Sequence, residues 1–245
     1  MARPTRTTVE RRRGGMRAAA AMRELARRIG ASNPHQFAGR FDAITGMRTQ
    51  TSGKWRQCFT GEKALSVQQL RLLSCMDADA ITLHDAGPCD LWLALWGEPG
   101  ALWQLCRTRL DSDGPMIEDT KWSEVADGCM QARSFEATLA EFEAELLLAE
   151  AYGQPLTLRH LTETVALFRL HGALSALAVM VADSQGLARC LQACFTDAAV
   201  HSDLTRLGVV DGVGQELAEF VDSPGAAIPA MDRWDALALK VAWIG

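Results

Sequence analysis

Cys190, Cys194 and His201 are the residues whose types and spacing come closest to a metal site. The two cysteines lie one helical turn apart, and thiolate and imidazole groups are ligands that zinc prefers. A structural zinc site uses four ligands at tighter spacings, and the chain has no CxxC pair to complete it. We therefore interpret both thiols as core residues and predict no metal site.

Two further patterns fall short of a ligand site. Asp111, Asp113 and Glu118 resemble a calcium loop, but the third acid, the glycine and the final glutamate are out of register. The segment Gly208–Gly214 lacks the third glycine, the preceding strand and the later acid of a dinucleotide site. We interpret the first as a solvated turn and the second as a turn that caps the next helix, and we predict no cofactor.

Catalytic signatures are missing from the sequence. It contains no Gly-x-Ser-x-Gly elbow, no P-loop and no His-Glu-x-x-His motif, and its histidines do not cluster in sequence with carboxylates in a way that suggests a general base. We therefore expect a protein that is not an enzyme. An enzyme whose site is assembled by folding of the C-terminal helices is a third, lower-ranked alternative.

The stretch of residues 51–61 has two chemically different sides. On a helical repeat Trp55, Cys58 and Phe59 share one side, while hydrogen-bonding and cationic side chains share the other. The residues of this second side are Ser52, Gly53, Arg56 and Gln57, with Lys54 near its edge. The pattern predicts a short amphipathic helix over residues 51–60 that ends at a left-handed Gly61.

A second helix is predicted directly after this stretch, over residues 66–76. Ser66 is its expected N-cap, and Val67, Leu70 and Leu73 are its expected buried residues. A small helix that is held by an apolar stripe and carries polar side chains opposite can enter a DNA major groove.

These residues carry a family resemblance. Residues 17–76 resemble the Cro/CI-type (XRE-like) helix-turn-helix repressor domain, which has apolar residues six and three positions before a glycine. Trp55, Cys58 and Gly61 occupy those positions here. The resemblance implies that Ser52, Gly53 and Gln57 read base edges.

Charge is unevenly distributed along the chain. Residues 1–60 contain thirteen Lys and Arg against three acids, a net charge of +10, and the remainder carries −15. This division favours an anionic partner for the N-terminal part, with phosphate contacts from Lys54, Arg56, Arg48 and the triple Arg11, Arg12 and Arg13. The alternative is a solvated arm that packs on the chain's own acidic part.

Helical periodicity continues along the whole chain, and strand-like alternation is nearly absent, so the prediction is an all-α protein. We predict a flexible basic arm over 1–15, a helix-turn-helix-like domain over 16–85 and a larger helical effector or dimerisation domain over 86–245. The predicted helices are 16–29, 34–45, 51–60, 66–76, 91–96, 101–110, 134–152, 174–181, 184–195, 215–221 and 231–243, and a further helix begins after its expected N-cap Thr157. Asn33 or Ser32 is the expected N-cap of the second helix, and Gly30 and Gly46 are expected to end the first and second helices. The expected buried residues include Ile44 of the second helix and Leu161, Val165 and Phe168 of the helix after Thr157.

Three tryptophans, Trp92, Trp96 and Trp103, lie close together in the sequence. We interpret them as core residues, and a dimer face or a partner groove is the alternative, because aromatic side chains are enriched in interface hot spots.

The cysteines and the apolar runs bear on the compartment. Seven scattered cysteines without a framework favour reduced thiols in a cytoplasm. The apolar run Ala173–Ala182 is too short for a bilayer, which needs about 20 residues. We expect a cytoplasmic protein without a membrane partner.

The interpretation that the sequence favours is a cytoplasmic bacterial, phage or plasmid transcriptional regulator that binds double-stranded DNA as a homodimer. The alternative from another class is a non-enzymatic helical adaptor whose basic N-terminus binds a protein partner or RNA.

Overall fold

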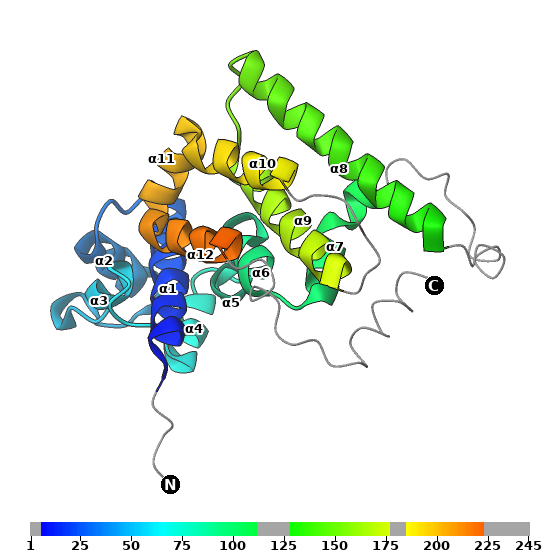
Figure 1. Ribbon diagram of the computed structural model, residues 1–245. Coiled ribbons are helices and arrows are strands. Elements are labelled where there is room, and N and C mark those ends of the chain that lie inside the picture. The colour runs from blue at the N-terminus through cyan, green and yellow to red at the C-terminus, as the bar shows by residue number, and fades with distance from the viewer. Residues whose placement is uncertain (1–5, 112–127, 177–184, 223–245) are drawn as a thin grey trace, which may run out of the picture. The chain divides into compact units, whose positions relative to one another are not determined.

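The computed structural model describes residues 6–111, 128–176 and 185–222, and every regular element within these ranges is a helix (Figure 1). The predicted all-α class is therefore confirmed. The chain divides into two compact units, one made of Met1–Trp92 with His201–Gln215 and the other of Leu93–Val200 with Glu216–Gly245. The sequence-based division at residue 85 did not anticipate the return of 201–215 to the first unit.

The first unit is built around one long helix, and its elements follow the chain order. They are α1 (Thr8–Arg28), α2 (Pro34–Thr45), η1 (Gln50–Ser52), α3 (Arg56–Phe59), α4 (Val67–Ser74), α5 (Ala80–Asp85) and η2 (Pro88–Asp90). The division between the units falls within three further helices, which are α6 (Leu91–Trp96), α11 (Ala198–Leu207) and α12 (Val210–Asp222).

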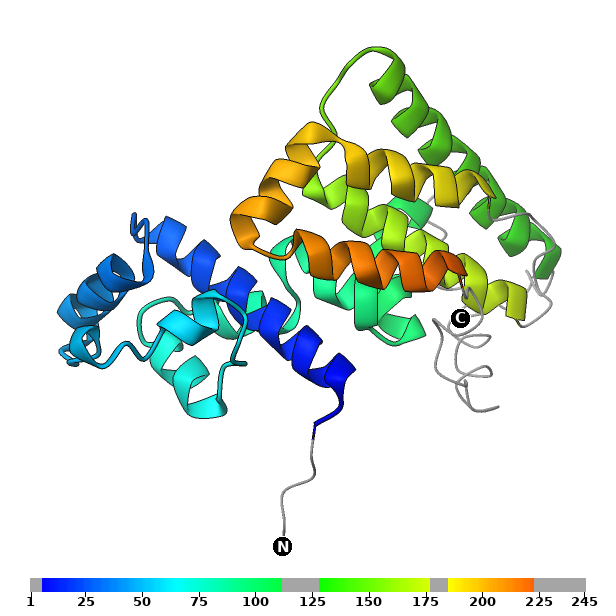
Figure 2. The same ribbon diagram turned by 60° about the vertical axis from the view of Figure 1, so that its left-hand side comes forward.

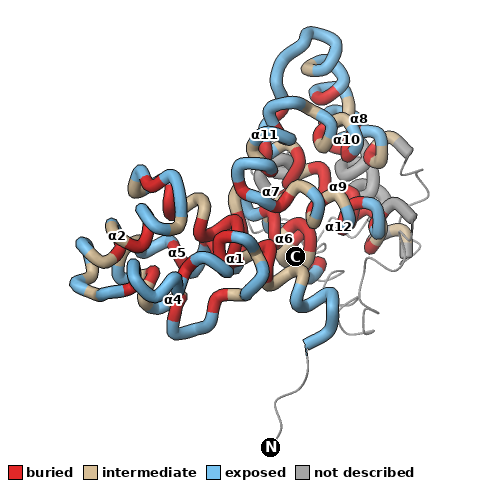
Figure 3. The backbone as a smooth tube through the Cα atoms, turned by 90° about the vertical axis from the view of Figure 1, so that its left-hand side faces the viewer, coloured by how far each residue is buried: buried red, intermediate tan, exposed pale blue. Residues whose placement is uncertain are grey.

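Helix α1 is the centre of this unit. Its buried residues are mostly alanines, with Met22 and Leu25 at 0% exposure, and its buried stretches are red in Figure 3. Small side chains on α1 let the short helices pack close against it. Both α3 and α5 contact α1, which is the long blue helix of Figure 2. Gly30 and Gly46, the expected ends of the first two helices, adopt left-handed conformations.

The sequence predicted a flexible arm over residues 1–15 and a first helix from Met16, but α1 begins at Thr8. The reason is a capping box: the Thr7 side chain accepts from the Glu10 N–H at 3.1 Å, and the Thr7 N–H donates to the Glu10 carboxylate at 2.7 Å. Arg11, Arg12 and Arg13 are therefore helical.

The single helix predicted over residues 51–60 is wrong. Residues 50–52 form the 3₁₀ helix η1, Gly53 adopts a left-handed conformation with φ of 58°, and α3 spans only Arg56–Phe59. The next helix, α4, has the predicted N-cap Ser66, whose side chain accepts from the Gln69 N–H at 3.2 Å.

Two predicted core residues lie on the surface instead. Val67 is 67% exposed and Ile44 is 55% exposed, whereas Leu73 is buried and Leu70 packs at the edge of the core. Val67 is the first residue of α4 and Ile44 lies in the last turn of α2. Helical spacing places such terminal residues on the apolar stripe, but the neighbouring elements do not extend far enough to cover them.

The second unit consists of α7 (Pro99–Asp111), α8 (Gly128–Ala151), α9 (Leu158–Ala176) and α10 (Gln185–Thr196), together with its parts of α6, α11 and α12. Helix α9 packs against α7 and α10, and α8 packs against α10 and α7 (Figure 1). Leu161, Val165 and Phe168 of α9 are buried as predicted.

The C-terminal predictions are mixed. The sequence did not predict α11, and α12 begins at Val210 rather than at Gln215, so the segment Gly208–Gly214 is a left-handed Gly208 followed by helix. The predicted separate helix over 174–181 is the end of α9 as far as Ala176. The rest of that prediction and the helix predicted over 231–243 lie outside the described residues.

Within the described ranges, no helix combines the length and the apolar character that a bilayer crossing requires.

Candidate nucleic-acid interface

The stretch around Trp55 is anchored by an aromatic cluster. Trp55 is 1% exposed, and its ring meets the rings of Phe41 and Phe37 edge to face at centroid distances of 5.1 Å and 5.9 Å. Cys58 and Phe59 are buried beside it, so the predicted inward side is confirmed. Each aromatic contact adds about 0.5–1.5 kcal/mol beyond its buried area, which holds this irregular segment firmly against α2.

A hydrogen-bond network centred on Asp42 of α2 also holds residues 49–55 in place. Asp42 of α2 accepts from the N–H of Thr49 at 2.6 Å and from the N–H of Gln50 at 2.9 Å. The Thr49 hydroxyl donates to Asp42 at 2.7 Å and accepts from the Trp55 indole N–H at 2.9 Å. Burial opposes ionisation of Asp42, but the hydrogen bonds from Thr49 and Gln50 outweigh it and lower the pKa of this carboxyl. One carboxylate therefore positions both η1 and the indole.

The side opposite the aromatic anchor faces outward. Ser52, Gly53, Lys54, Arg56 and Gln57 are all exposed, and none of them is an acid. The structure thus keeps the two-sided character predicted for this stretch, although a 3₁₀ turn, a left-handed glycine and a single helical turn replace one continuous helix.

These exposed residues form one wall of a groove, which we call the α3–α4 groove. It has a volume of about 500 Å³, and its lining residues are Ser52, Gly53, Lys54, Arg56, Gln57, Lys63, Ser66, Gln68 and Gln69. Three are cations, and no carboxylate is among them; Glu62 is exposed but does not line the groove. Such a lining attracts anions and offers hydroxyl and amide groups for hydrogen bonds.

Sequence reasoning missed the second wall of this groove. Lys63 and Gln68 are exposed and lie beyond the glycine that ends the resembling stretch. The capping signal at Ser66 was visible, and it could have indicated that the first turn of α4 lies beside Gln57. Gln69 is different, because it is buried and its amide lies 3.7 Å from the Cys58 thiol. Burial raises the pKa of that thiol, so Cys58 serves as a core residue.

The predicted phosphate-binding arginines are not gathered in the same place. Arg48 is exposed but does not line the groove. Arg11 is exposed and bonds to Thr8 of its own helix at 3.5 Å, whereas Arg12 and Arg13 are half-buried and have other partners. Of the predicted cations, the groove brings together Lys54 and Arg56 and adds Lys63.

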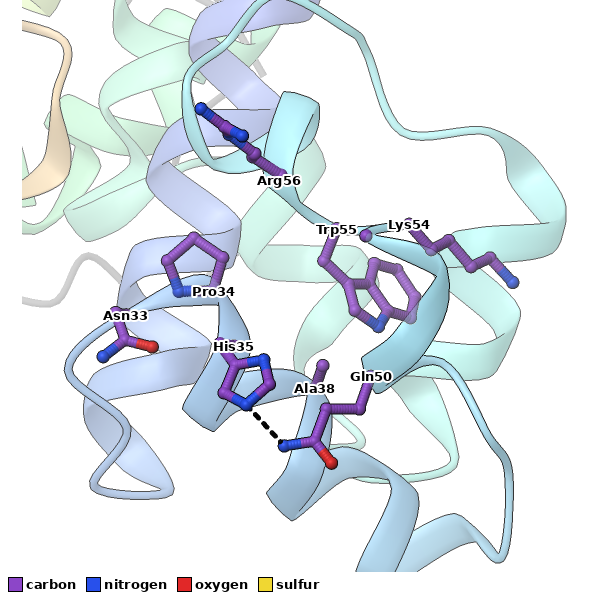
Figure 4. Close-up of a pocket in the computed structure, with 9 residues that line it drawn as sticks. Asn33, Pro34, His35, Ala38, Gln50, Lys54, Trp55 and Arg56 are labelled. Carbon is purple, nitrogen blue, oxygen red and sulfur yellow. Dashed lines mark hydrogen bonds between the residues drawn. The ribbon is translucent and has the colours of Figure 1, made fainter.

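A second hollow lies on the other side of Gly53, and we call it the α2–α3 pocket (Figure 4). Its volume is about 310 Å³, and its lining residues are Asn33, Pro34, His35, Ala38, Gln50, Gly53, Lys54, Trp55 and Arg56. In Figure 4, Pro34 and His35 stand on one side and Trp55 on the other, with Ala38 and Gln50 below and Arg56 above.

The metal-ligand candidates from the sequence behave as structural residues. Cys190 and Cys194 are buried, and burial raises the pKa of Cys190 to about 12 and that of Cys194 to about 11, so neither is a ready thiolate. His201 is exposed on α11. No group of three or more potential metal ligands occurs among the described residues. Asp113 and Glu118 lie outside those residues.

The three tryptophans differ from one another. Trp92 is 1% exposed and belongs to the core of the first unit. Trp96 and Trp103 of the second unit are half-buried, and the Trp96 indole donates to the buried Glu216 at 2.8 Å.

No protein-family model, no curated protein and no solved structure matches this chain.

Proposed function

We propose that this protein is a DNA-binding transcriptional regulator that contacts double-stranded DNA through residues 52–57 and the α3–α4 groove. The observation that carries the proposal is the outward position of Ser52, Arg56 and Gln57 beside a groove with three cations and no carboxylate. Phosphate neutralisation by Lys and Arg supplies most of the affinity of such contacts. The buried rings of Trp55 and Phe59 hold the backbone that carries Ser52, Arg56 and Gln57 and so fix the outward orientation of these residues.

Each exposed residue has a distinct role in this proposal. The Gln57 amide suits bidentate contact with an adenine edge. The Ser52 hydroxyl donates to the Thr49 carbonyl oxygen at 2.7 Å, so it keeps its lone pairs to accept from a donor on a base edge. Gly53 has open space around its Cα, which permits close approach of the nucleic acid. Lys54, Arg56 and Lys63 hold phosphates, with Arg48 and Arg11 as outlying cations.

The short length of α3 shapes the mode of binding. One helical turn reads few base pairs, so affinity for a defined site requires two copies on paired half-sites, and we propose a homodimer. The same shortness favours a second candidate, an adaptor that holds RNA by its backbone, because phosphate contacts do not depend on a helix that enters a major groove.

Salt titrations of duplex binding separate these candidates. We expect Arg56→Ala to weaken binding to all duplexes and to reduce the salt slope by about 1, since it removes one phosphate contact. Gln57→Ala should instead erode the preference among sequences by about 1–3 kcal/mol at one position. Binding is measured by fluorescence anisotropy with a preferred duplex from a random pool, an unrelated duplex and an RNA duplex.

Matched controls are available on the neighbouring elements. Arg71 is an exposed cation of α4 that does not line the groove, and Gln104 is an exposed amide of α7, so Arg71→Ala and Gln104→Ala should bind as the parent does. If Arg56→Ala and Gln57→Ala also match the parent on every duplex, the proposed interface is wrong. Preference for RNA over DNA would support the adaptor.

A further inference from the structure

The α2–α3 pocket differs in chemistry from the groove next to it. Its inner surface is mainly apolar and is formed by the Pro34 ring, the Ala38 methyl group and the edge of Trp55. Trp55 is held in place by its bond to Thr49, and Ala38 is buried on α2, so this surface is rigid. Trp55 is 1% exposed, so only the margin of its indole reaches the pocket, and the Pro34 ring is the more accessible apolar wall. A rigid apolar floor of this kind suits a flat ring system.

Polar groups surround this apolar surface. The His35 Nε2 and the Gln50 Nε2 lie 3.0 Å apart and link α2 to η1 across the pocket (Figure 4). Asn33 adds an amide, and Lys54 and Arg56 are the charged lining residues. Among the described lining residues there is no carboxylate, so a ligand with a negative group meets attraction and a cationic ligand meets repulsion.

The size of the pocket limits the ligand further. About 310 Å³ is at the lower end of the range for small-molecule sites, roughly 300–1,000 Å³, and corresponds to a ligand of one or two rings. Arg56 lies above the pocket in Figure 4, whereas the Lys54 side chain extends away from His35. Arg56 is therefore the better placed of the two cations for a negative group at the pocket mouth.

We propose that the α2–α3 pocket binds a small planar ring that carries one anionic group, with the ring against Pro34 beside the margin of Trp55 and the anion at Arg56. Two sources share this chemistry, a nucleoside monophosphate and an aromatic carboxylate. Gly53, Lys54 and Arg56 line both this pocket and the α3–α4 groove. If the proposed DNA binding holds, a ligand in the pocket competes for these residues and weakens it.

The test begins with the protein free of nucleic acid. Adenosine 5′-monophosphate, benzoate, adenosine and inorganic phosphate are titrated separately by isothermal titration calorimetry. We expect adenosine 5′-monophosphate or benzoate to bind about 10-fold or more tightly than adenosine and phosphate, because each of the latter lacks either the anion or the ring. Binding of adenosine 5′-monophosphate would identify a nucleoside monophosphate as the ligand class, and binding of benzoate would identify an aromatic carboxylate.

Substitutions place the binding in the pocket. His35→Asp introduces a negative charge into the lining and should weaken binding about 10-fold or more, and an acid in the first turn of α2 suits the helix dipole. Thr51→Asp makes a comparable charge change at an exposed residue that does not line the pocket, and it should retain binding. The proposal is overturned if neither ring-bearing anion outperforms phosphate and adenosine, or if His35→Asp binds as the parent does.

A separate measurement tests the link to DNA. Gln57→Ala alters the groove and not the pocket, so it should leave the calorimetric affinity unchanged while it changes duplex binding. Failure of duplex binding would overturn the proposed function and leave the calorimetric result intact. If DNA binds and the ring-bearing anion does not weaken it, the proposed competition is wrong.

Discussion

At Gly15, in the middle of α1, a hydrogen atom is the largest substituent that the surroundings accept. A Cβ there would lie 2.2 Å from the backbone oxygen of Gly61. Gly61 in turn has φ of 76° and approaches the Gly15 backbone, so the two glycines form a direct contact between α1 and the loop before α4. Because neither glycine has a side chain, the loop that carries Lys63 can lie directly against the backbone of α1.

We predict that Gly15→Ala lowers the free energy of unfolding by about 1–3 kcal/mol, because the added methyl group overpacks against backbone that cannot rotate away. Helix propensity predicts the opposite sign, a gain of about 1 kcal/mol for Gly→Ala in a helix. Urea unfolding followed by circular dichroism measures the difference.

The control for this substitution is Gly100→Ala in α7, where a Cβ meets nothing within 4 Å. It should leave stability unchanged or raise it slightly. Equal stability gains for both variants would show that the contact between Gly15 and Gly61 is not tight.

At the scale of the elements, the interruption between η1 and α3 at Gly53 determines which side chains face the solvent. The N–H groups of Thr49 and Gln50 donate to the Asp42 carboxylate and hold the start of η1 against α2. The left-handed Gly53 then changes the direction of the chain, and Trp55 is buried in the core two residues later. This conformation orients Ser52 and Gln57 outward on two short elements instead of one helix.

We predict that Asp42→Ala destabilises the first unit by about 1.5–3 kcal/mol, since several hydrogen bonds to a charged group are lost together. Asp42→Asn, which keeps an acceptor oxygen, should lose less. Duplex affinity at a pH and temperature where both variants are folded should fall in the same order.

Asp79→Ala provides the comparison, because the Asp79 side chain is 74% exposed and its pair with Arg28 lies on the surface. Its effect should stay within about 0.5 kcal/mol. An Asp42→Ala variant with the parent's stability and affinity would show that the network does not position the segment.

At the scale of the whole molecule, α11 returns the chain to the first unit after the helices of the second unit. Glu24 of α1 pairs with Arg206 of α11 at 3.0 Å and with Arg27 at 2.6 Å. Arg23 donates to the carbonyl oxygens of Thr205 and Arg206 at 3.4 Å and 3.3 Å. Glu24 and Arg206 are 182 positions apart in sequence, so these contacts close a very long loop of chain.

The ion pairs of Glu24 with Arg206 and Arg27 should make the free energy of unfolding depend on pH. The hydrogen bond from Arg27 is the largest influence on Glu24 and, with Arg206, lowers its pKa to about 2 against the opposing effect of burial. Because the folded pKa is depressed, the stabilisation is complete above the unfolded pKa of about 4.3 and is lost as pH falls towards about 2.

We therefore predict that Glu24→Gln lowers stability at pH 7 by about 1–2 kcal/mol after allowance for solvent screening, and that the difference from the parent disappears near pH 2. Urea midpoints measured across this pH range provide the test. Glu62→Gln, at an exposed residue, should follow the parent at every pH. If the stability difference between Glu24→Gln and the parent stayed the same at every pH, the lowered pKa of Glu24 would not be its cause.

Several features of this protein could be predicted from its amino-acid order alone. They are the helical class, the cap Ser66, the end of α2 at Gly46, the left-handed Gly61 and the inward side of the Trp55 stretch. These features depend on side-chain periodicity and on backbone chemistry within a few residues, which a sequence displays directly. Each of them is local.

Other features became visible only in the folded chain: the break at Gly53, the second groove wall at Lys63 and Gln68, and the return of α11 to α1. Each depends on a partner that is distant in sequence or in another element, such as Asp42 for η1 or Glu24 for Arg206. Such pairings leave no periodic signal, because the free energy that selects them comes from burying or hydrogen-bonding groups that only folding brings together.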